Sequence, residues 1–360
     1  MKLVLYGSFP ASEADRIVRH LTSHWEVVPV LNEAPAEEKR KALAGAEVMV
    51  TSVYRSRDPP APNLRLLQCS STGTDRVDLA HLPPDCIVCN VHGHEIAIAE
   101  YAICAVLDWA IGYRSLAASF SDGTWTLAEW VDGPNHGEAF GKTLALLGFG
   151  RIGRKIAMRG KALGMRVTAL SAWRSAPPDQ KLIDGAYRAE EWRAFAESAD
   201  FLVVCCPLTA ETRGMVGAEW FAAMNPDAVV VNVGRGPIIE ESTLYAALAE
   251  GRIRGATIDV WYKYPPASGQ RVRASQFAFH ELPNVVMTPH ASGHTEGTWD
   301  RRFRAIAENL EAFAQGRPLA NAISREASQK TRYTEKPNSG ERRGRGLRAK
   351  VGGRIGSCPA

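Results

Sequence analysis

The chain has 360 residues and a formal net charge of +4, a length that fits two domains of ordinary size. It contains no run of about 18 apolar residues, which excludes an ordinary membrane-spanning helix. Its seven cysteines, an odd number, argue against a disulfide framework. The first residues read as a strand and lack the regions of a signal peptide, so we expect a cytoplasmic protein without a membrane partner.

Residues 1 to about 95 alternate strand-like and helix-like segments, a pattern that favours a parallel sheet. The expected strands are Lys2–Tyr6, Glu26–Val30, Glu47–Val53, Leu64–Ser70 and Cys86–Asn90. The expected helices are Ala11–Thr22 and Pro35–Leu43, with Pro35 at a first helical position. Cys86 and Cys89 form a C-x-x-C sequence, but residues three apart on a strand face opposite sides and no second ligand pair follows. No metal site is therefore expected.

A long apolar helix is expected from Ile96 to Tyr113, crossing from the first domain to the second. The polar stretch Ser119–Gly141 is expected to be irregular. From Lys142 strands and helices alternate again, and the Val-rich runs suit a doubly wound sheet that is buried on both faces. These expected strands are Thr143–Leu147, Arg166–Leu170, Phe201–Cys206, Ala228–Val233, Ala256–Val260 and Val285–Thr288.

The last expected helix, Thr298–Ala314, has apolar residues at helical spacing and is interpreted as a packing element. From Arg325 to Ala360 ten basic and three acidic residues give a net charge of +7, which leaves −3 of the total +4 for the rest. This tail has almost no large apolar residues and is predicted to be disordered. A solvated extension is favoured over a contact with nucleic acid or acidic partners.

The turn after the strand Thr143–Leu147 has the spacing G-x-G-x-x-G. Gly148 permits a sharp turn, Gly150 lets the backbone approach a pyrophosphate, and Gly153 lets the following helix pack close to the strand. The helix N-terminus then directs free N–H groups and a partial positive charge toward the phosphates. The spacing alone is weak, but a strand before it and a helix after it predict dinucleotide binding.

The strand Arg166–Leu170 ends without the acidic residue that usually holds the ribose hydroxyls of NAD. Ser171 is small and neutral, and Arg174 can pair with a phosphate. This pattern favours NADP over NAD. The alternative is that Arg174 is a surface residue and that the rest of the site binds NAD.

Three more polar residues follow strand ends, where ligands of such sheets lie. Arg235 can hold a substrate carboxylate with its forked guanidinium. Asp259 could accept a hydrogen bond from a nicotinamide carboxamide or support a neighbouring residue. His290 is placed to act as an acid or base. Each could instead be structural, but their coincidence at one sheet edge favours a catalytic site.

The chain resembles the D-isomer-specific 2-hydroxyacid dehydrogenase family over about residues 45 to 315. The resemblance rests on motifs that occur in the family's order. They are the Gly148–Gly153 turn with Arg151 and Ile152, Pro207-Leu208-Thr209 with Glu211-Thr212, Asn232 to Gly236, Ala256 to Val260, Pro289-His290, and upstream Ser71 to Asp78, Asn90 to Gly93 and Ala99-Glu100.

The resemblance implies an α/β fold in which a Rossmann doubly wound parallel-sheet cofactor domain is inserted into a flavodoxin-like α/β substrate domain. The substrate domain would comprise residues 1–96 and a returning C-terminal segment, 293–324, with the cofactor domain at 97–292 and the disordered tail at 325–360. It also implies an NAD(P)-dependent oxidoreductase acting on small 2-hydroxy or 2-keto acids, such as glyoxylate- or hydroxypyruvate-like acids. Members of this family are expected to be homodimers.

By the same resemblance, His290 exchanges the hydroxyl proton, and Arg235 holds the carboxylate with the backbone amides of Thr72 and Gly73. Asp259 orients the nicotinamide. The implied cofactor contacts are Gly148, Gly150, Arg151, Ile152, Gly153, Ser171, Arg174, Pro207, Val233 and Asp259.

One position departs from the family. Tyr264 stands where the family usually has the glutamate that partners the catalytic histidine. A carboxylate beside a histidine raises its pKa, whereas a tyrosine carries no negative charge near neutral pH. We therefore predict that His290 titrates low, and that reduction, which needs protonated His290, improves in acid. A carboxylate from elsewhere, such as Glu281 or Glu296, could take the glutamate's place.

Two other functions are weighed against this one. Formate-type dehydrogenases lack the same glutamate and need no proton transfer. A non-catalytic, dinucleotide-sensing binding protein of the same fold is the second alternative, although intact Arg235 and His290 argue against it. His94 and His294 are expected near the cleft, where they could select the substrate or simply face solvent.

Overall fold

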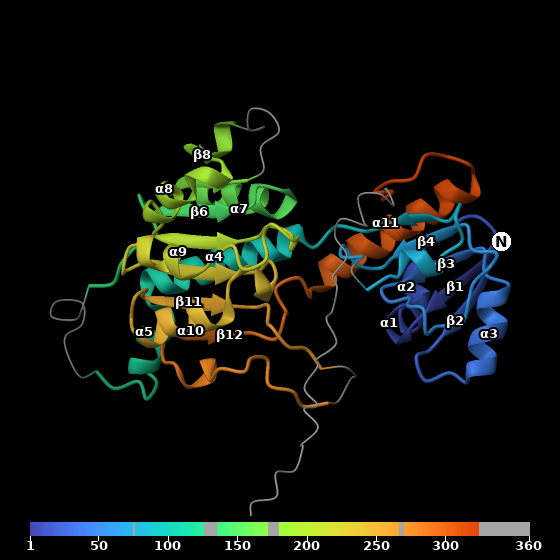
Figure 1. Ribbon diagram of the computed structural model, residues 1–360, viewed down its shortest axis with the longest axis horizontal. Coiled ribbons are helices and arrows are strands. Elements are labelled where there is room, and N and C mark those ends of the chain that lie inside the picture. The colour runs from blue at the N-terminus through green and yellow to red at the C-terminus, as the bar shows by residue number, and fades with distance from the viewer. Residues whose placement is uncertain (75, 126–134, 172–179, 266–269, 324–360) are drawn as a thin grey trace, which may run out of the picture.

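The computed structural model describes residues 1–74, 76–125, 135–171, 180–265 and 270–323. Two parallel sheets organise it, and Figure 1 shows them as two lobes. The first sheet has the strand order β2-β1-β3-β4-β5, which is the flavodoxin-like order. Its strands are β1 (Lys2–Tyr6), β2 (Glu26–Val30), β3 (Val48–Thr51), β4 (Leu66–Cys69) and β5 (Ile87–Cys89).

Side chains alternate across this sheet, so each face has its own core. Leu3 and Leu5 of β1 pack with Phe303, Ile306 and Leu310 of α11 (Glu296–Ala314). The opposite face is covered by α3 (Ala36–Ala44), and the short helices α1 (Ser8–Ser12) and α2 (Ala14–Val18) lie next to β2 and α11. The last helix of the chain therefore returns to the first sheet, as its orange colour beside the blue strands in Figure 1 shows.

The second sheet has the order β12-β11-β10-β9-β6-β7-β8, with every pair parallel. Counted from β6, this is the Rossmann order with one further strand. The order reverses between β6 and β9, which is where such sheets bind ligands. The strands are β6 (Thr143–Leu147), β7 (Arg166–Leu170), β8 (Gly185–Tyr187), β9 (Phe201–Val204), β10 (Val229–Asn232), β11 (Gly255–Ile258) and β12 (Val285–Met287).

Helices cover both faces of this second sheet. On one face α4 (Glu95–Ile111) packs against α7 (Arg151–Ala162) over Leu144, Leu146 and Val203. On the other face lie α8 (Trp192–Glu197), α9 (Ala218–Ala223) and α10 (Glu241–Ala249). The helix α5 (Tyr113–Ser119) follows α4 and buries none of its residues. Short 3-10 turns lie at Leu79–His81, Gln180–Leu182, Ala189–Glu191, Gly236–Ile238 and Phe279–Glu281.

The predicted fold class is confirmed, but several details differ. The helix expected over Ile96–Tyr113 ends at Ile111, and a separate helix α5 follows it. The predicted helix Ala11–Thr22 is broken at Glu13, whose ψ of 16° is not helical, so α1 and α2 are separate. Pro35 precedes α3 as its cap rather than occupying its first turn. The edge strand β8 was not predicted. The tail and Arg174 lie outside the described residues, and the domain boundaries stay a prediction.

Among the described helices, no single one is long and apolar enough to cross a membrane. The bent pair α4 and α5 passes such a test by length and composition only. Eight residues of α4 are buried against the protein, which accounts for its apolar composition.

Candidate active site

The three glycines of the turn between β6 and α7 differ in what an added side chain would contact. Gly148 has φ +108°, and a Cβ there would lie 2.7 Å from the Cys206 nitrogen. A Cβ on Gly153 would lie 2.4 Å from the Gly148 oxygen. A Cβ on Gly150 would meet nothing within 4 Å. The protein itself requires the first and third glycines, whereas Gly150 leaves open the space that a pyrophosphate needs at a helix N-terminus. The turn thus fits a dinucleotide.

The remaining predicted cofactor residues lie along the same sheet edge. Arg151 opens α7 with an exposed side chain, Ile152 is half-buried, and Val233 is buried after β10. Ser171 follows β7, and its N–H donates to the Tyr187 oxygen at 3.3 Å. Pro207, after β9, is exposed and its carbonyl accepts a hydrogen bond from Thr212.

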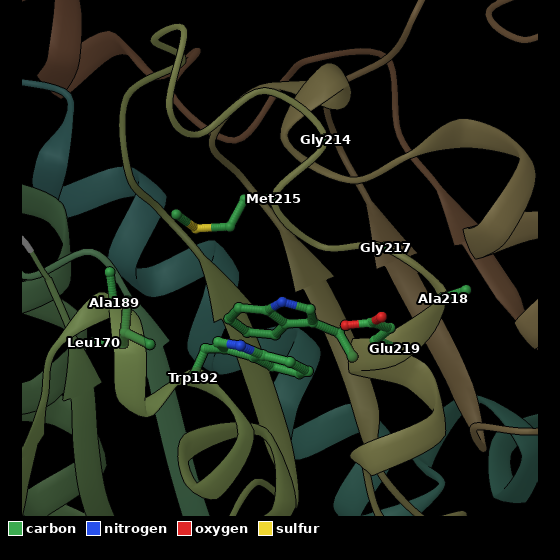
Figure 2. Close-up of a pocket in the computed structure, with 9 residues that line it drawn as sticks. Leu170, Ala189, Trp192, Gly214, Met215, Gly217, Ala218 and Glu219 are labelled. Carbon is green, nitrogen blue, oxygen red and sulfur yellow. The ribbon is translucent and has the colours of Figure 1, made fainter.

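A cavity of about 330 Å³ lies at the carboxyl end of β7, beside Ser171. The indole rings of Trp192 and Trp220 line it as a stacked pair with centroids 5.4 Å apart, and Met215 lies above them in Figure 2. Neither Arg235 nor His290 lines this cavity. The cavity therefore lies apart from the reacting residues, next to the end of β7.

His290 follows β12 in a left-handed conformation with φ +58°, which is uncommon for a residue with a side chain and is concentrated at functional sites. Its Nδ1 lies 3.0 Å from the Tyr264 hydroxyl, which also accepts the Trp261 N–H at 3.0 Å. The substitutes considered from the sequence pair elsewhere, since Glu281 lies by His280 and Glu296 by Arg16. Tyr264 is therefore the side chain that contacts His290 Nδ1.

Asp259 holds the loop that carries His290. It is fully buried, and its Oδ1 accepts hydrogen bonds from the Thr288 hydroxyl at 2.6 Å and the Ala291 N–H at 2.8 Å. Its Oδ2 accepts the Ser292 N–H at 3.0 Å. Burial opposes ionisation, but these hydrogen bonds outweigh it and lower the pKa of Asp259 below its usual value. Of its two predicted roles, the structure shows the support of a neighbour, and the nicotinamide contact stays a prediction.

Arg235 follows β10 with an exposed side chain, and its Nη1 donates to the Gly234 oxygen at 2.8 Å. Asn232 fixes this turn by accepting the Gly234 N–H and donating to the Arg235 carbonyl. Burial, and then the Arg235 charge, lower the pKa of His290, while Asp259 opposes them. Arg235 and His290 thus both follow strands of the same sheet edge, and the charge of Arg235 acts on the His290 ring.

The predicted substrate loop contacts His94. The Thr72 hydroxyl donates to the Val91 carbonyl at 2.6 Å, and the His94 Nδ1 lies 3.3 Å from that hydroxyl. The carbonyl of Gly73 accepts a hydrogen bond from Ser71, which fixes the loop. Burial, then the Arg302 charge and more weakly Arg235, lower the pKa of His94 to about 4. His94 thus lies beside the predicted substrate loop, and His294, which is exposed and packs against Trp299, lies near enough to His290 for its charge to lower the pKa of that ring.

Two residues of this site were missed in the sequence. The Tyr101 hydroxyl lies 2.6 Å from the Thr288 hydroxyl. Because Thr288 gives its hydrogen to Asp259, Tyr101 must be the donor. These residues are 187 positions apart and carry no shared motif, so only the fold brings them together.

Comparison with known proteins identifies the class. The sequence pattern of the D-isomer specific 2-hydroxyacid dehydrogenase, NAD binding domain, matches residues 103–292. Glycerate dehydrogenase of Methylorubrum extorquens is 30% identical over 290 residues, which cover 78% of this chain and 87% of that protein. D-3-phosphoglycerate dehydrogenase of Methanocaldococcus jannaschii is 29% identical over 303 residues, covering 82% of this chain. The matched region spans 55% of that archaeal protein's length.

A solved structure of a D-isomer specific 2-hydroxyacid dehydrogenase family protein from Aeromonas salmonicida shares the fold. Its TM-score is 0.75 at 24% identity, and the match covers 90% of this chain and 98% of that one. The chain belongs to the D-isomer specific 2-hydroxyacid dehydrogenase family, a family of NAD(P)-dependent oxidoreductases. The predicted family and the predicted nicotinamide dinucleotide are confirmed.

Proposed function

We propose that the protein interconverts a small D-2-hydroxy acid and the matching 2-keto acid, with His290 as acid and base and Arg235 as the carboxylate ligand. One observation carries the proposal. His290 is held in a left-handed conformation by a buried carboxylate, with its Nδ1 occupied by Tyr264 and Arg235 nearby. Such strain in a residue at the carboxyl ends of the strands is expected where chemistry takes place.

A nicotinamide dinucleotide held at the Gly148–Gly153 turn would supply the hydride donor or acceptor for C2 of the acid. The Arg235 guanidinium offers parallel N–H donors to the substrate carboxylate and polarises the neighbouring carbonyl. The backbone amides of Thr72 and Gly73 add donors to the same carboxylate. Because Tyr264 occupies Nδ1 of His290, Nε2 is the nitrogen that donates the proton in reduction and accepts it in oxidation.

For the cofactor we propose NADP. Ser171 places a short neutral side chain after β7, where a carboxylate would repel a 2′-phosphate. Arg174 is proposed to pair with that phosphate. For the acid we propose hydroxypyruvate- or glyoxylate-like compounds, in keeping with the glycerate dehydrogenase relative.

We also propose a homodimer formed through the cofactor domain. The helix α5 buries none of its residues, and large aromatic side chains lie exposed on and after it. Tyr113 is 67% exposed, Trp125 65% and Phe140 69%. Large exposed aromatic side chains are enriched at protein interfaces. Sedimentation should give a dimer, and a concentration-independent monomer would contradict this part of the proposal.

The function is tested by absorbance at 340 nm with a panel of 2-keto acids, 2-hydroxy acids and formate, with NADH, NADPH and their oxidised forms. We expect reduction of at least one 2-keto acid and its loss in His290→Ala. The control His280→Ala alters an exposed histidine that pairs with Arg273 and should keep the wild-type rate. Tight cofactor binding without turnover would indicate the binding protein instead, and turnover of formate alone would indicate the formate-type enzyme.

A further inference from the structure

The loop after β12 contacts the first turns of α4 at both of its ends. Where the loop begins, the Tyr101 hydroxyl lies 2.6 Å from the Thr288 hydroxyl. Where the loop ends, a Cβ on Gly293 would lie 3.5 Å from the His94 Cβ and 3.6 Å from the Ile98 Cδ1, so the backbone packs directly on the helix. The three helix residues are spaced by four and three positions, which places them on one side of α4. This side of the helix therefore supports the whole loop.

A directed chain of hydrogen bonds forms the first of these two contacts. The Asp259 carboxylate can only accept, so the Thr288 hydroxyl donates to its Oδ1 at 2.6 Å. The Thr288 oxygen then accepts the hydrogen of the Tyr101 hydroxyl. The carbonyl of Thr288 is held separately, by the Trp261 Nε1 at 2.8 Å. Tyr101 thereby favours the one side-chain rotamer in which Thr288 reaches the carboxylate.

The chain of hydrogen bonds ends on the backbone that flanks His290. The two carboxylate oxygens of Asp259 accept the N–H groups of Ala291 and Ser292, which directly follow the histidine. Thr288 lies two residues before it, so the carboxylate holds the loop on both sides. The left-handed φ of +58° at His290 is costly for a residue with a side chain, and such a conformation persists only where its surroundings over-determine it. These hydrogen bonds supply that support.

The ring and the hydroxyl of Tyr101 have separate roles. The ring is half-buried against the core between α4, α7 and the second sheet, where a phenylalanine would pack in the same way. The hydroxyl is the part that contacts Thr288. Burial raises the pKa of Tyr101 above its usual value, so the hydroxyl keeps its hydrogen at neutral pH. Removal of the hydroxyl alone therefore tests its role and leaves the packing in place.

We propose that Tyr101 is a positioning residue for proton transfer, whose hydroxyl acts through Thr288 and Asp259 to keep His290 in its reactive conformation. The catalytic loop of the second sheet is then held in place by α4, the helix whose first residues also contact the predicted substrate loop. This inference rests on the proposed function, since it concerns the histidine that the proposed reaction uses.

The test compares Tyr101→Phe with the matched control Tyr262→Phe. Tyr262 is a half-buried tyrosine of the same lobe, and its hydroxyl donates to the Ile239 carbonyl at 3.1 Å, so the control also loses one tyrosine hydrogen bond. The first readout is kcat and KM for the best 2-keto acid of the panel, with the better of NADPH and NADH. The second is the NMR signal of the His290 ring in protein with isotope-labelled histidine, identified by its absence from His290→Ala. This second readout requires no turnover.

Tyr101→Phe should lower kcat about fivefold, the equivalent of one ordinary hydrogen bond, and change KM for the acid and Kd for the cofactor less than about twofold. Introduced into Thr288→Val, it should lower kcat by less than about twofold, because Thr288 transmits the effect. Tyr262→Phe should keep kcat within about twofold of the wild type. The His290 signal should shift or broaden in Tyr101→Phe and stay unchanged in Tyr262→Phe.

An unchanged kcat in Tyr101→Phe, or a full further loss in the Thr288→Val background, would overturn this inference and leave the proposed function standing. If the wild type reduces no 2-keto acid, the proposed function fails and the NMR signal decides. A His290 signal that changes only in Tyr101→Phe would still support the positioning role, and a signal that is the same in both variants and the wild type would overturn it.

Discussion

The Tyr264 hydroxyl lies 3.0 Å from Nδ1 of His290, at the position where the family resemblance places a glutamate. A carboxylate only accepts hydrogen bonds, so it fixes the proton on Nδ1 and keeps Nε2 for the substrate. A phenol has one hydrogen and two lone pairs, and can meet Nδ1 either way. Since one lone pair already accepts the Trp261 N–H, Tyr264 can accept from Nδ1–H of the imidazolium and of the neutral tautomer whose Nε2 is free to act as a base. It can also donate to Nδ1 of the other neutral tautomer, whose Nε2 carries the proton. This pair therefore stabilises the imidazolium less than a carboxylate would.

The glycine turn offers a matched pair of variants. Gly150→Ala should leave the free energy of unfolding within about 0.5 kcal/mol, because the added Cβ meets nothing in the protein. The same methyl group should weaken NADPH binding at least tenfold, about 1.4 kcal/mol. Gly153→Ala should instead destabilise the fold by about 1–3 kcal/mol, because its Cβ would press on the Gly148 carbonyl. Chemical unfolding and fluorescence titration of NADPH separate the two, and equal effects on both quantities would refute the assignment.

Asp259→Asn should lower both stability and activity. The amide can offer only one oxygen to the three donors that the carboxylate now satisfies, so a buried N–H loses its partner. We expect a loss of about 2–3 kcal/mol in unfolding free energy and a fall in kcat of more than tenfold, because the His290 loop shifts. Asp300→Asn, which removes an exposed partner of Arg16 and Arg19, is the control and should change neither quantity appreciably. Full activity of Asp259→Asn would show that this carboxylate does not position His290.

The sequence predicted the scaffold better than the details of the site. Long apolar runs between turn residues predicted the bounds of β1, β2, β6 and β7 correctly, since buried parallel strands have a strong periodic signal. The edge strand β8 was not predicted, because a strand of three residues, one of them glycine, is too short to show a recognisable hydrophobic pattern. Arg235 and His290 were predicted as site residues because each follows a strand, and all parallel strands of a sheet end at the same edge. Tyr101 and Thr288 could not be predicted, because their significance depends on neighbours supplied by other segments.

Acid should destabilise the protein through His94. Its pKa is lowered from about 6.5 in the unfolded chain to about 4 in the fold, so the unfolded state binds the proton first. Stability is therefore lost as the pH falls from 6.5 to 4, levels off below that, and the His94 share reaches at most about 3 kcal/mol. His290 and His92, whose pKa values are also lowered, add in the same direction. Between pH 4 and 7 the free energy of unfolding should depend less steeply on pH in His94→Asn than in the wild type. The same slope in both proteins would contradict this prediction.

Ser171→Asp tests the proposed cofactor preference. A carboxylate after β7 would repel a 2′-phosphate and accept hydrogen bonds from the ribose hydroxyls of NADH. We expect kcat/KM for NADPH to fall about a hundredfold, roughly 2.7 kcal/mol, while the value for NADH stays constant or rises. A wild-type enzyme that prefers NADH, or a variant that loses both cofactors equally, would contradict the NADP proposal.

The most direct test of the central claim is the pH dependence of kcat/KM for 2-keto acid reduction, measured from pH 5 to 9 in the wild type and in Tyr264→Glu. Burial and Arg235 lower the pKa of His290, so the protonated form that reduction needs is lost as the pH rises toward neutrality. We predict that wild-type kcat/KM rises steadily as the pH falls below 7. Tyr264→Glu should shift the midpoint of this profile to higher pH by about one unit or more. A wild-type optimum at or above pH 7.5, or a profile that Tyr264→Glu does not move, would contradict the account.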